Sequence, residues 1–229
     1  MSDTPSFTPD LFQFLHELSE NNVKSWWEAN RDRYEAVVRG PALDFITAMG
    51  ERLGEISPHY TAVAKKSGGS MMRPFRDTRF SKDKTPYKTN LGIQFRHSSG
   101  KDIHAPGLYV HIDPDEAFLA TGIWHPDSAS LKAIRGRIDG EPKAWKRARD
   151  SKPFRELFEL SGETLKRPPR GYDKDHPLIE DLKRKDHIAV MNLEIDDVLD
   201  IGFIDDVVDA FKAAKPYAKF LTKAVGQPF

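Results

Sequence analysis

The sequence predicts a single α+β domain, in which helices from both ends of the chain pack mainly on one face of a mostly antiparallel sheet. Apolar residues recur at helical spacing over residues 8–56, alternate with polar residues over residues 70–125, and return to helical spacing with one further strand over residues 127–229. Glycine and proline are scattered between these segments instead of pooled in a linker, which favours one domain over residues 1–229.

Three helices are expected in the first segment. Thr8 marks the start of the first helix, because its hydroxyl can cap free amide groups and the proline that follows fits the first turn. Two asparagines at 21–22 end this helix, and Gly-Pro at 40–41 separates the second helix from the third. The large aromatic residues of the second helix, Trp26 and Trp27 among them, are expected to pack in the core.

Three strands are expected in the middle segment. Apolar residues occupy the odd positions of residues 91–97 and the even positions of residues 107–113, and a turn leads into a third apolar run at residues 117–124. Each of the first two strands therefore has one apolar and one polar face, which is typical of an antiparallel sheet covered on one side.

The last segment is expected to be helical except for a strand at residues 188–193. Pro216 is expected to begin a separate final helix, since proline is tolerated in the first turn of a helix and disfavoured in its interior. The expected helices cover residues 127–138, 143–150, 153–159, 178–185, 203–214 and 216–225.

The composition excludes several classes of protein. Hydrophobic residues make up 38% of the 229 residues, and 35 basic against 35 acidic side chains give no net charge, so a folded core is expected and non-specific coating of nucleic acid is not. No apolar run is long enough to span a bilayer and no secretory signal is recognisable, which predicts a soluble cytoplasmic protein. The absence of cysteine excludes disulfides and cysteine-bound zinc.

Charge is distributed unevenly along the neutral chain. Residues 73–88 contain six basic and two acidic side chains, and residues 143–170 contain nine basic and four acidic ones. Residues 186–209 contain eight acidic side chains and no lysine or arginine. If the two basic segments converge, they form one positive surface that attracts anionic ligands.

The loop at residues 76–89, just before the strand expected at residues 91–97, contains side chains that suit anion binding. Guanidinium groups bind phosphate or carboxylate as a fork, lysines add point charges and hydroxyl groups add hydrogen bonds. A structural clasp is the alternative interpretation, in which Asp77 and Asp83 pair with these cations. The candidate ligand-binding residues, on this loop and the neighbouring strands, are Arg76, Arg79, Ser81, Lys82, Lys84, Tyr87, Lys88, Arg96 and Tyr109.

Several motifs resemble those of one protein family. The loop reads RDTRFSKDKTPYKT, an Asn-Asn-x-x-x-Trp-Trp segment precedes it at residues 21–27, and GLYVH follows at residues 107–111. Further matches are the Gly-Ile-Trp turn at 122–124 and KRPPRGY at 166–172. Together they resemble a widespread family of conserved hypothetical proteins, a domain of unknown function. The resemblance implies a single domain and transfers no catalytic residue.

The polar face of the strand expected at residues 107–113 carries a further group of candidate functional residues. Tyr109, His111 and Asp113 alternate along this strand and are expected to project together. His111 and Asp113 are candidate catalytic residues, because a histidine near a carboxylate can act as a general acid or base. A solvated sheet face is the simpler interpretation. Two potential ligands rarely hold a metal ion, so no metal site and no cofactor are expected.

Three function hypotheses follow. The leading one is a module that binds a phosphate- or carboxylate-bearing small molecule at the basic loop beside the polar sheet face. The alternatives are an enzyme that acts on a phosphorylated substrate with His111 as acid/base, and an adaptor that docks an acidic protein or nucleic acid. No membrane partner is expected, nucleic acid is not favoured, and the oligomeric state is not predicted. The signatures of P-loop, dinucleotide-binding, serine-hydrolase and zincin enzymes are absent.

Overall fold

The computed structural model describes residues 7–100 and 105–229, and it confirms the predicted α+β fold. The described residues form one six-stranded antiparallel sheet in the order β1-β2-β3-β4-β6-β5. The strands are β1 (Tyr60–Thr61), β2 (Leu91–His97), β3 (Gly107–Ile112), β4 (Ala117–Ile123), β5 (Glu159–Ser161) and β6 (His187–Leu193).

Helices precede the sheet, follow its first four strands and end the chain. They are α1 (Pro9–Glu20), α2 (Lys24–Ala29), α3 (Arg31–Tyr34), the π-helical η1 (Glu35–Arg39), α4 (Gly40–Arg52), the 3₁₀ turn η2 (Leu53–Glu55), α5 (Ser128–Gly140), α6 (Pro142–Arg149), α7 (Lys152–Leu157), α8 (Ile179–Leu182), α9 (Ile195–Leu199) and α10 (Phe203–Ala224). The three helices expected before the sheet and the three expected strands are all present.

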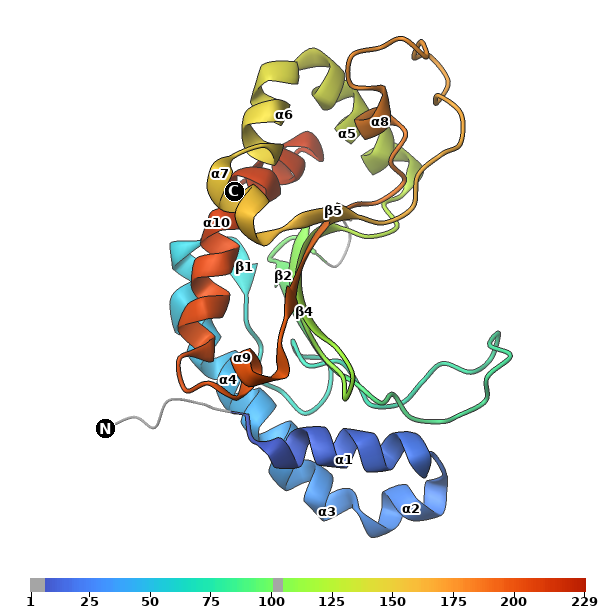
Figure 1. Cartoon of the computed structure of the whole chain (residues 1–229), viewed down its shortest axis with the longest axis vertical. Coiled ribbons are helices and arrows are strands. Elements are labelled where there is room, and N and C mark those ends of the chain that lie inside the picture. The colour runs from blue at the N-terminus through green and yellow to red at the C-terminus, as the bar shows by residue number, and fades with distance from the viewer. Residues whose placement is uncertain (1–6, 101–104) are drawn as a thin grey trace.

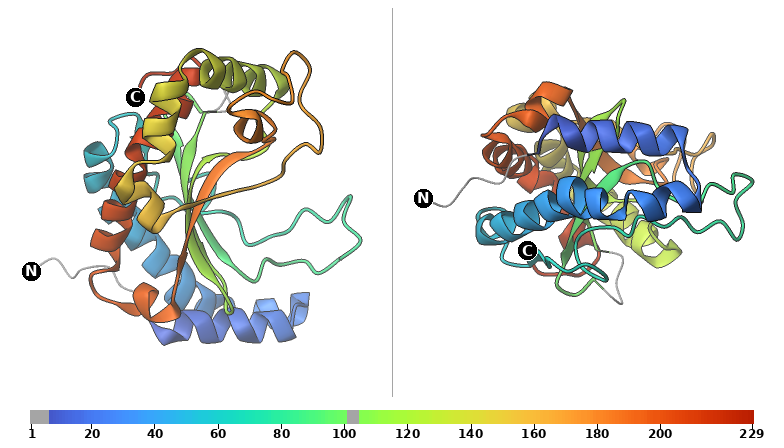
Figure 2. Two further views of the ribbon diagram at one scale, coloured as in Figure 1. Left: turned by 45° about the horizontal axis from the view of Figure 1, so that its top comes forward. Right: turned by 90° about the horizontal axis from the view of Figure 1, so that it is seen from below.

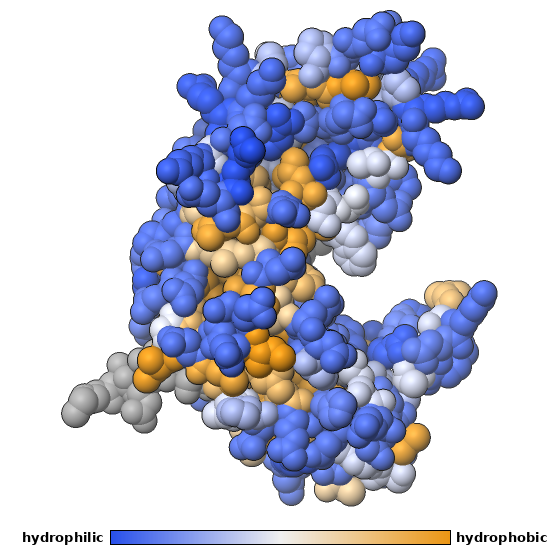
Figure 3. Space-filling view, viewed as in Figure 1, coloured by the Kyte–Doolittle hydropathy of each residue, from blue (hydrophilic) through white to orange (hydrophobic). Residues whose placement is uncertain are grey.

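The molecule has the outline of a letter C around one face of the sheet. α4 and α10 cover the other face, α1 to α3 lie at one end, and α5, α6 and α8 lie at the opposite end (Figure 1). A long loop between β1 and β2 projects from the sheet on the uncovered side (Figure 2). The space-filling view shows that this side is hollowed between the loop and the upper helices (Figure 3). We call the uncovered side the open sheet face.

Successive side chains of β3 point to opposite faces of the sheet, and this alternation determines which of them lie in the core. Leu108, Val110 and Ile112 are fully buried against the helices, whereas Tyr109 and His111 lie between them on the open sheet face. β4 continues the pattern, since its residue opposite Val110 is the buried Leu119. The covered face is therefore a conventional hydrophobic core, which stabilises the sheet and leaves its other face for polar groups.

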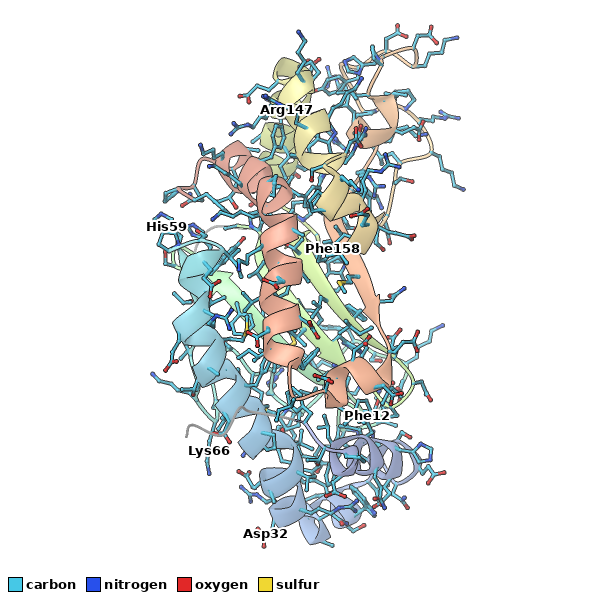
Figure 4. All side chains as sticks on the ribbon, turned by 60° about the vertical axis from the view of Figure 1, so that its left-hand side comes forward. Phe12, Asp32, His59, Lys66, Arg147 and Phe158 are labelled. Carbon is cyan, nitrogen blue, oxygen red and sulfur yellow. The ribbon has the colours of Figure 1, made fainter. Side chains whose placement is uncertain are left out.

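The final helix differs from the prediction, because α10 is one continuous helix of 22 residues with Pro216 in its interior. Proline removes one backbone hydrogen bond and disfavours the preceding turn. The helix continues because the residues on both sides are in the core: Ala214 and Tyr217 are fully buried. Figure 4 shows α10 running beside α4 over the covered face of the sheet. Burial of this apolar stripe outweighs the local preference for a break.

Two short strands were not predicted. β1 pairs with the end of β2 at one edge of the sheet, and β5 pairs with β6 at the other. The segment after the predicted helix at 153–159 thus turns from α7 into β5. Both strands have only two or three residues, too few for an alternating pattern to be recognised in a sequence.

Candidate functional site

The projecting loop is a two-stranded arm. Its two sides pair at the base, where the Arg76 amide donates to the Pro86 carbonyl at 2.9 Å and the Lys88 amide donates to the Pro74 carbonyl at 2.7 Å. Phe75 and Tyr87 form an isolated β-bridge between the two sides. We call residues 73–88 the basic arm. The basic arm contains the six lysines and arginines of the first basic segment.

The asparagine–tryptophan motif holds the base of this arm. The Asn22 side chain donates to the Tyr87 carbonyl and accepts from the Tyr87 amide, both at 3.0 Å. The Trp27 ring stacks on the Tyr87 ring with centroids 4.4 Å apart and planes at 14°. Tyr87, one of the predicted ligand-binding residues, is only 4% exposed, and its side chain packs in the core. The two motifs that carry the family resemblance therefore meet in space.

We expect Asn22→Ala to destabilise the chain by about 1–2 kcal/mol, because the partly buried amide and carbonyl of Tyr87 each lose a partner. The arm should open more often, so trypsin should cut after its lysines faster than in wild type. Asn21→Ala is the matched control, since Asn21 is exposed and bonds only within its own helix end. Equal cleavage rates for Asn22→Ala and wild type would contradict this anchoring role.

Two arginines of the arm pair with its two aspartates. Arg76 bonds the Asp83 carboxylate and the Thr85 hydroxyl. Arg79 forms a bidentate pair with Asp77, at 2.9 and 2.7 Å. These contacts hold the pKa of both aspartates below their usual range, chiefly through hydrogen bonds from Arg79 to Asp77 and from the Thr85 amide to Asp83. The clasp interpretation therefore accounts for these two arginines.

The tip of the arm differs from its sides. Lys84 donates to the Thr78 carbonyl at 2.7 Å, whereas Lys82 is exposed and makes no ion pair among the described residues. Ser81 is partly exposed beside Phe80, whose exposure reaches 95%. The tip thus presents an aromatic ring and free positive charge to solvent.

An unmatched pair of cations lies at the base of the arm. Lys88 is partly buried, and burial lowers its pKa, with the positive charge of Arg73 adding to the effect. Within residues 7–100 and 105–229, neither Arg73 nor Lys88 forms an ion pair with a carboxylate. The Lys88 ammonium lies 3.9 Å from the Met72 sulfur. Asp77 lies close enough to Arg73 for the Arg73 charge to lower the pKa of Asp77, but no carboxylate pairs with Lys88, and an anionic ligand would reduce the repulsion between the two cations.

Gly92 connects this cation pair to the polar residues of β3. A Cβ atom at Gly92 would lie 2.7 Å from the Tyr109 hydroxyl and 3.1 Å from the Met72 sulfur. Only glycine therefore allows the tyrosine ring and the methionine to approach the strand from both sides. Lys88, Met72, Tyr109 and His111 consequently line one continuous part of the open sheet face.

His111 lies in a partly buried cluster of polar and aromatic side chains. Its Nδ1 lies 3.2 Å from the Tyr109 hydroxyl and 3.4 Å from the Asn90 amide nitrogen, and its ring stacks on Phe118 at 4.5 Å and 8°. With the Asn90 amide donating to Nδ1, the ring proton of a neutral His111 would lie on Nε2, which faces Glu116 at 3.7 Å. Burial lowers the pKa of His111, while Glu116 and Asp113 oppose this shift.

The other predicted residues of the open sheet face, Asp113 and Arg96, form hydrogen bonds to their own neighbours in the chain. Asp113 follows β3 and accepts the Asp115 amide at 3.2 Å, so its carboxylate orders the turn, and burial raises its pKa. Arg96 lies further along β2, where its guanidinium donates to the Gln94 side chain at 3.0 Å. Sequence reasoning missed Asn90 and Phe118. Phe118 is the register partner of His111 on β4, and Asn90, just before β2, lies 3.4 Å from the His111 Nδ1.

The two basic segments do not converge. Residues 143–170 include α6 and α7 at the end of the molecule opposite α1, whereas the basic arm starts near the other end (Figure 1). A cavity of about 450 Å³ beside α6 and α7 includes Arg149, Arg155 and Arg184 in its lining. Four carboxylates share the lining of this cavity, so it lacks the excess positive charge of the arm.

Two familiar features are absent from the described residues. Among the described residues, no three His, Asp or Glu side chains gather in a way that could hold a metal ion. No helix in residues 7–100 and 105–229 combines the length and the apolar character needed to cross a membrane.

Comparison with protein families gives a match over most of the chain. A family model described as "Conserved hypothetical protein (DUF2461)" matches residues 10–220. No curated protein matches the chain. The matched region includes the arm, its anchor and all the residues of the open sheet face.

Proposed function

The chain belongs to the DUF2461 family of conserved hypothetical proteins, and from the geometry of its site we propose that it binds a phosphate- or carboxylate-bearing small molecule between the base of the basic arm and the open sheet face. The observation that carries this proposal is the unmatched pair of Arg73 and Lys88. Lys88 is partly buried, lies near another cation and has no carboxylate partner among the described residues. Such an arrangement costs free energy unless an anion completes it.

The surroundings of this pair suit a bound anion with an organic part. Lys88 supplies a point charge and Arg73 a planar fork, while the Asn90 amide and the Tyr109 hydroxyl can donate further hydrogen bonds. The stacked rings of His111 and Phe118 provide a flat surface beside these donors. Among the predicted residues at the tip, Arg79, Lys82 and Lys84 add to the positive field around the entrance, and Ser81 adds a hydroxyl group that can form hydrogen bonds.

The proposal is tested by measuring the binding of inorganic phosphate, pyrophosphate and citrate by calorimetry. We expect Lys88→Met and Arg73→Met each to weaken binding about ten- to a hundredfold, because a charge-assisted hydrogen bond contributes roughly 1.5–3 kcal/mol. Lys174→Met is the matched control, since Lys174 is an exposed lysine on the loop after β5. It should bind the probes like wild type.

Two results would overturn the proposal. One is wild-type protein that binds none of the three anions at low ionic strength. The other is an anion affinity that is unchanged in both Lys88→Met and Arg73→Met. That result would show that the two cations have only a structural role in the arm.

A second candidate is an enzyme acting on a phosphorylated substrate, with His111 as acid/base. It is supported by the lowered pKa of His111, chiefly from burial, and by the contact of its Nδ1 with the Tyr109 hydroxyl at 3.2 Å on the open sheet face. In that case His111→Gln would abolish turnover of a phosphoester and leave anion affinity within a few fold of wild type. If His111→Gln binds the anion more weakly than wild type and wild type shows no turnover, the simple binding module is favoured.

A further inference from the structure

An apolar groove of about 310 Å³ opens on the covered side of the sheet, between β4, β6 and α10. Its floor includes Leu119 and Val207, which are almost fully buried. Met191 and Leu193 on β6 are partly exposed, and Leu157 at the end of α7 is 39% exposed. Figure 3 shows apolar side chains gathered on the surface in this region. The helices therefore leave part of the apolar sheet uncovered.

The rim of this groove is acidic. Asp197, Asp206 and Asp209 line it, and all three are exposed. Lys212 pairs with Asp209, but Asp197 and Asp206 form no ion pair with another described residue. Burial and the surrounding aspartates raise the pKa of Asp206. An apolar groove with this rim fits an apolar side chain that is flanked by cations.

The tip of the basic arm has that chemistry. Phe80 is 95% exposed, and the Arg79 guanidinium lies 5.8 Å from the centre of its ring. The exposed Lys82 follows two residues later. A fully exposed phenylalanine at the end of a projecting arm is unfavourable in water, so contact with an apolar surface would stabilise it.

The arm and the groove lie on opposite sides of the same sheet. Leu119 and Met191 are register partners whose side chains lie on the face that α10 covers, whereas the arm projects from the other side (Figure 2). An arm therefore cannot fill the groove of its own copy. We propose that the arm tip of one copy, with Phe80 inserted, docks in the acidic apolar groove of a second copy. Such a contact is head-to-tail, and it extends to further copies unless it closes into a ring.

Two variants test this contact by analytical ultracentrifugation at low ionic strength. Phe80→Asp disables the arm, and Asp206→Lys with Leu193→Lys disables the groove. Wild type should associate with rising concentration, and salt should weaken this association. Each variant alone should associate about tenfold more weakly or remain monomeric. An equimolar mixture of the two should form a one-to-one dimer, because one intact arm and one intact groove remain.

Trp124→Ser is the matched control, since Trp124 is a second exposed aromatic residue, 69% exposed, on the turn after β4. It should associate like wild type. A wild type that stays monomeric over the whole concentration range would overturn the proposal. So would self-association that persists in both variants, or a mixture that contains only monomers. The proposal is independent of the anion site, because it uses the tip of the arm and not its base.

Discussion

Replacing Asp181 by alanine is expected to destabilise the chain by about 3 kcal/mol or more. Asp181 is 4% exposed and bonds the Arg149 guanidinium between α8 and α6. Without Asp181, the partly buried guanidinium keeps only Asp150, which it contacts at 2.9 Å. Removing one partner of a buried ion pair is costly because the remaining charge has been taken out of water without full compensation.

A double-mutant cycle checks this expectation by urea denaturation. Arg149→Met combined with Asp181→Leu should be considerably more stable than Asp181→Ala, because no buried charge is then left alone. Glu180→Ala is the matched control: Glu180 pairs only with Lys183 and is 78% exposed, so the change should cost less than about 0.5 kcal/mol. A small effect of Asp181→Ala would show that Asp150 and water suffice for Arg149.

Acidification from pH 7 to pH 4 is expected to cost about 3 kcal/mol of stability through His187 alone. His187 is fully buried on β6, and neither ring nitrogen has a hydrogen-bond partner among the described residues. Burial, with smaller effects from Arg184 and Arg135, lowers its pKa to about 3 from 6.5. Because the folded pKa lies below the unfolded one, the unfolded chain takes up the proton first. The stability is therefore complete above pH 6.5 and is lost as the pH falls toward 3.

His187→Leu isolates this contribution. The variant should lose less stability between pH 7 and pH 4 than wild type, measured as the urea midpoint at each pH, because it has no imidazole to protonate. His16→Gln is the matched control, since the His16 side chain is 62% exposed and its ion pair with Glu20 lies at the surface. Wild type and His187→Leu with the same pH dependence would show that other groups cause the acid sensitivity.

The periodicity of the sequence predicted most of the architecture. Alternation in residues 107–113 correctly assigned Val110 to the core and His111 to the open sheet face. Helical spacing correctly assigned Trp27 to the core. The break expected at Pro216 did not occur, because the surrounding residues of α10 are buried on one continuous surface. The conformational preference of a residue such as proline determines where a helix ends only if burial of the neighbouring residues does not favour continuing the helix.

The candidate site was predicted less completely. The segment was recognised from its charge, but its sequence cannot show which cations pair with Asp77 and Asp83 and which remain unmatched. The structure pairs Arg79 with Asp77 and leaves Lys88 beside Arg73. The burial of Tyr87 could not be predicted for the same reason, since its contact with Asn22 joins residues 65 positions apart.

The sequence by itself determined the elements, the faces of the strands and the uneven charge, because these depend on residues a few positions apart. Only the tertiary structure decided which charges are neutralised, which apolar surface stays uncovered and which motifs meet. These properties depend on distances between segments that are remote in the chain, as between Trp27 and Tyr87. Burial and Coulomb interactions vary with such distances, so they arise only when the sheet and its helices assemble.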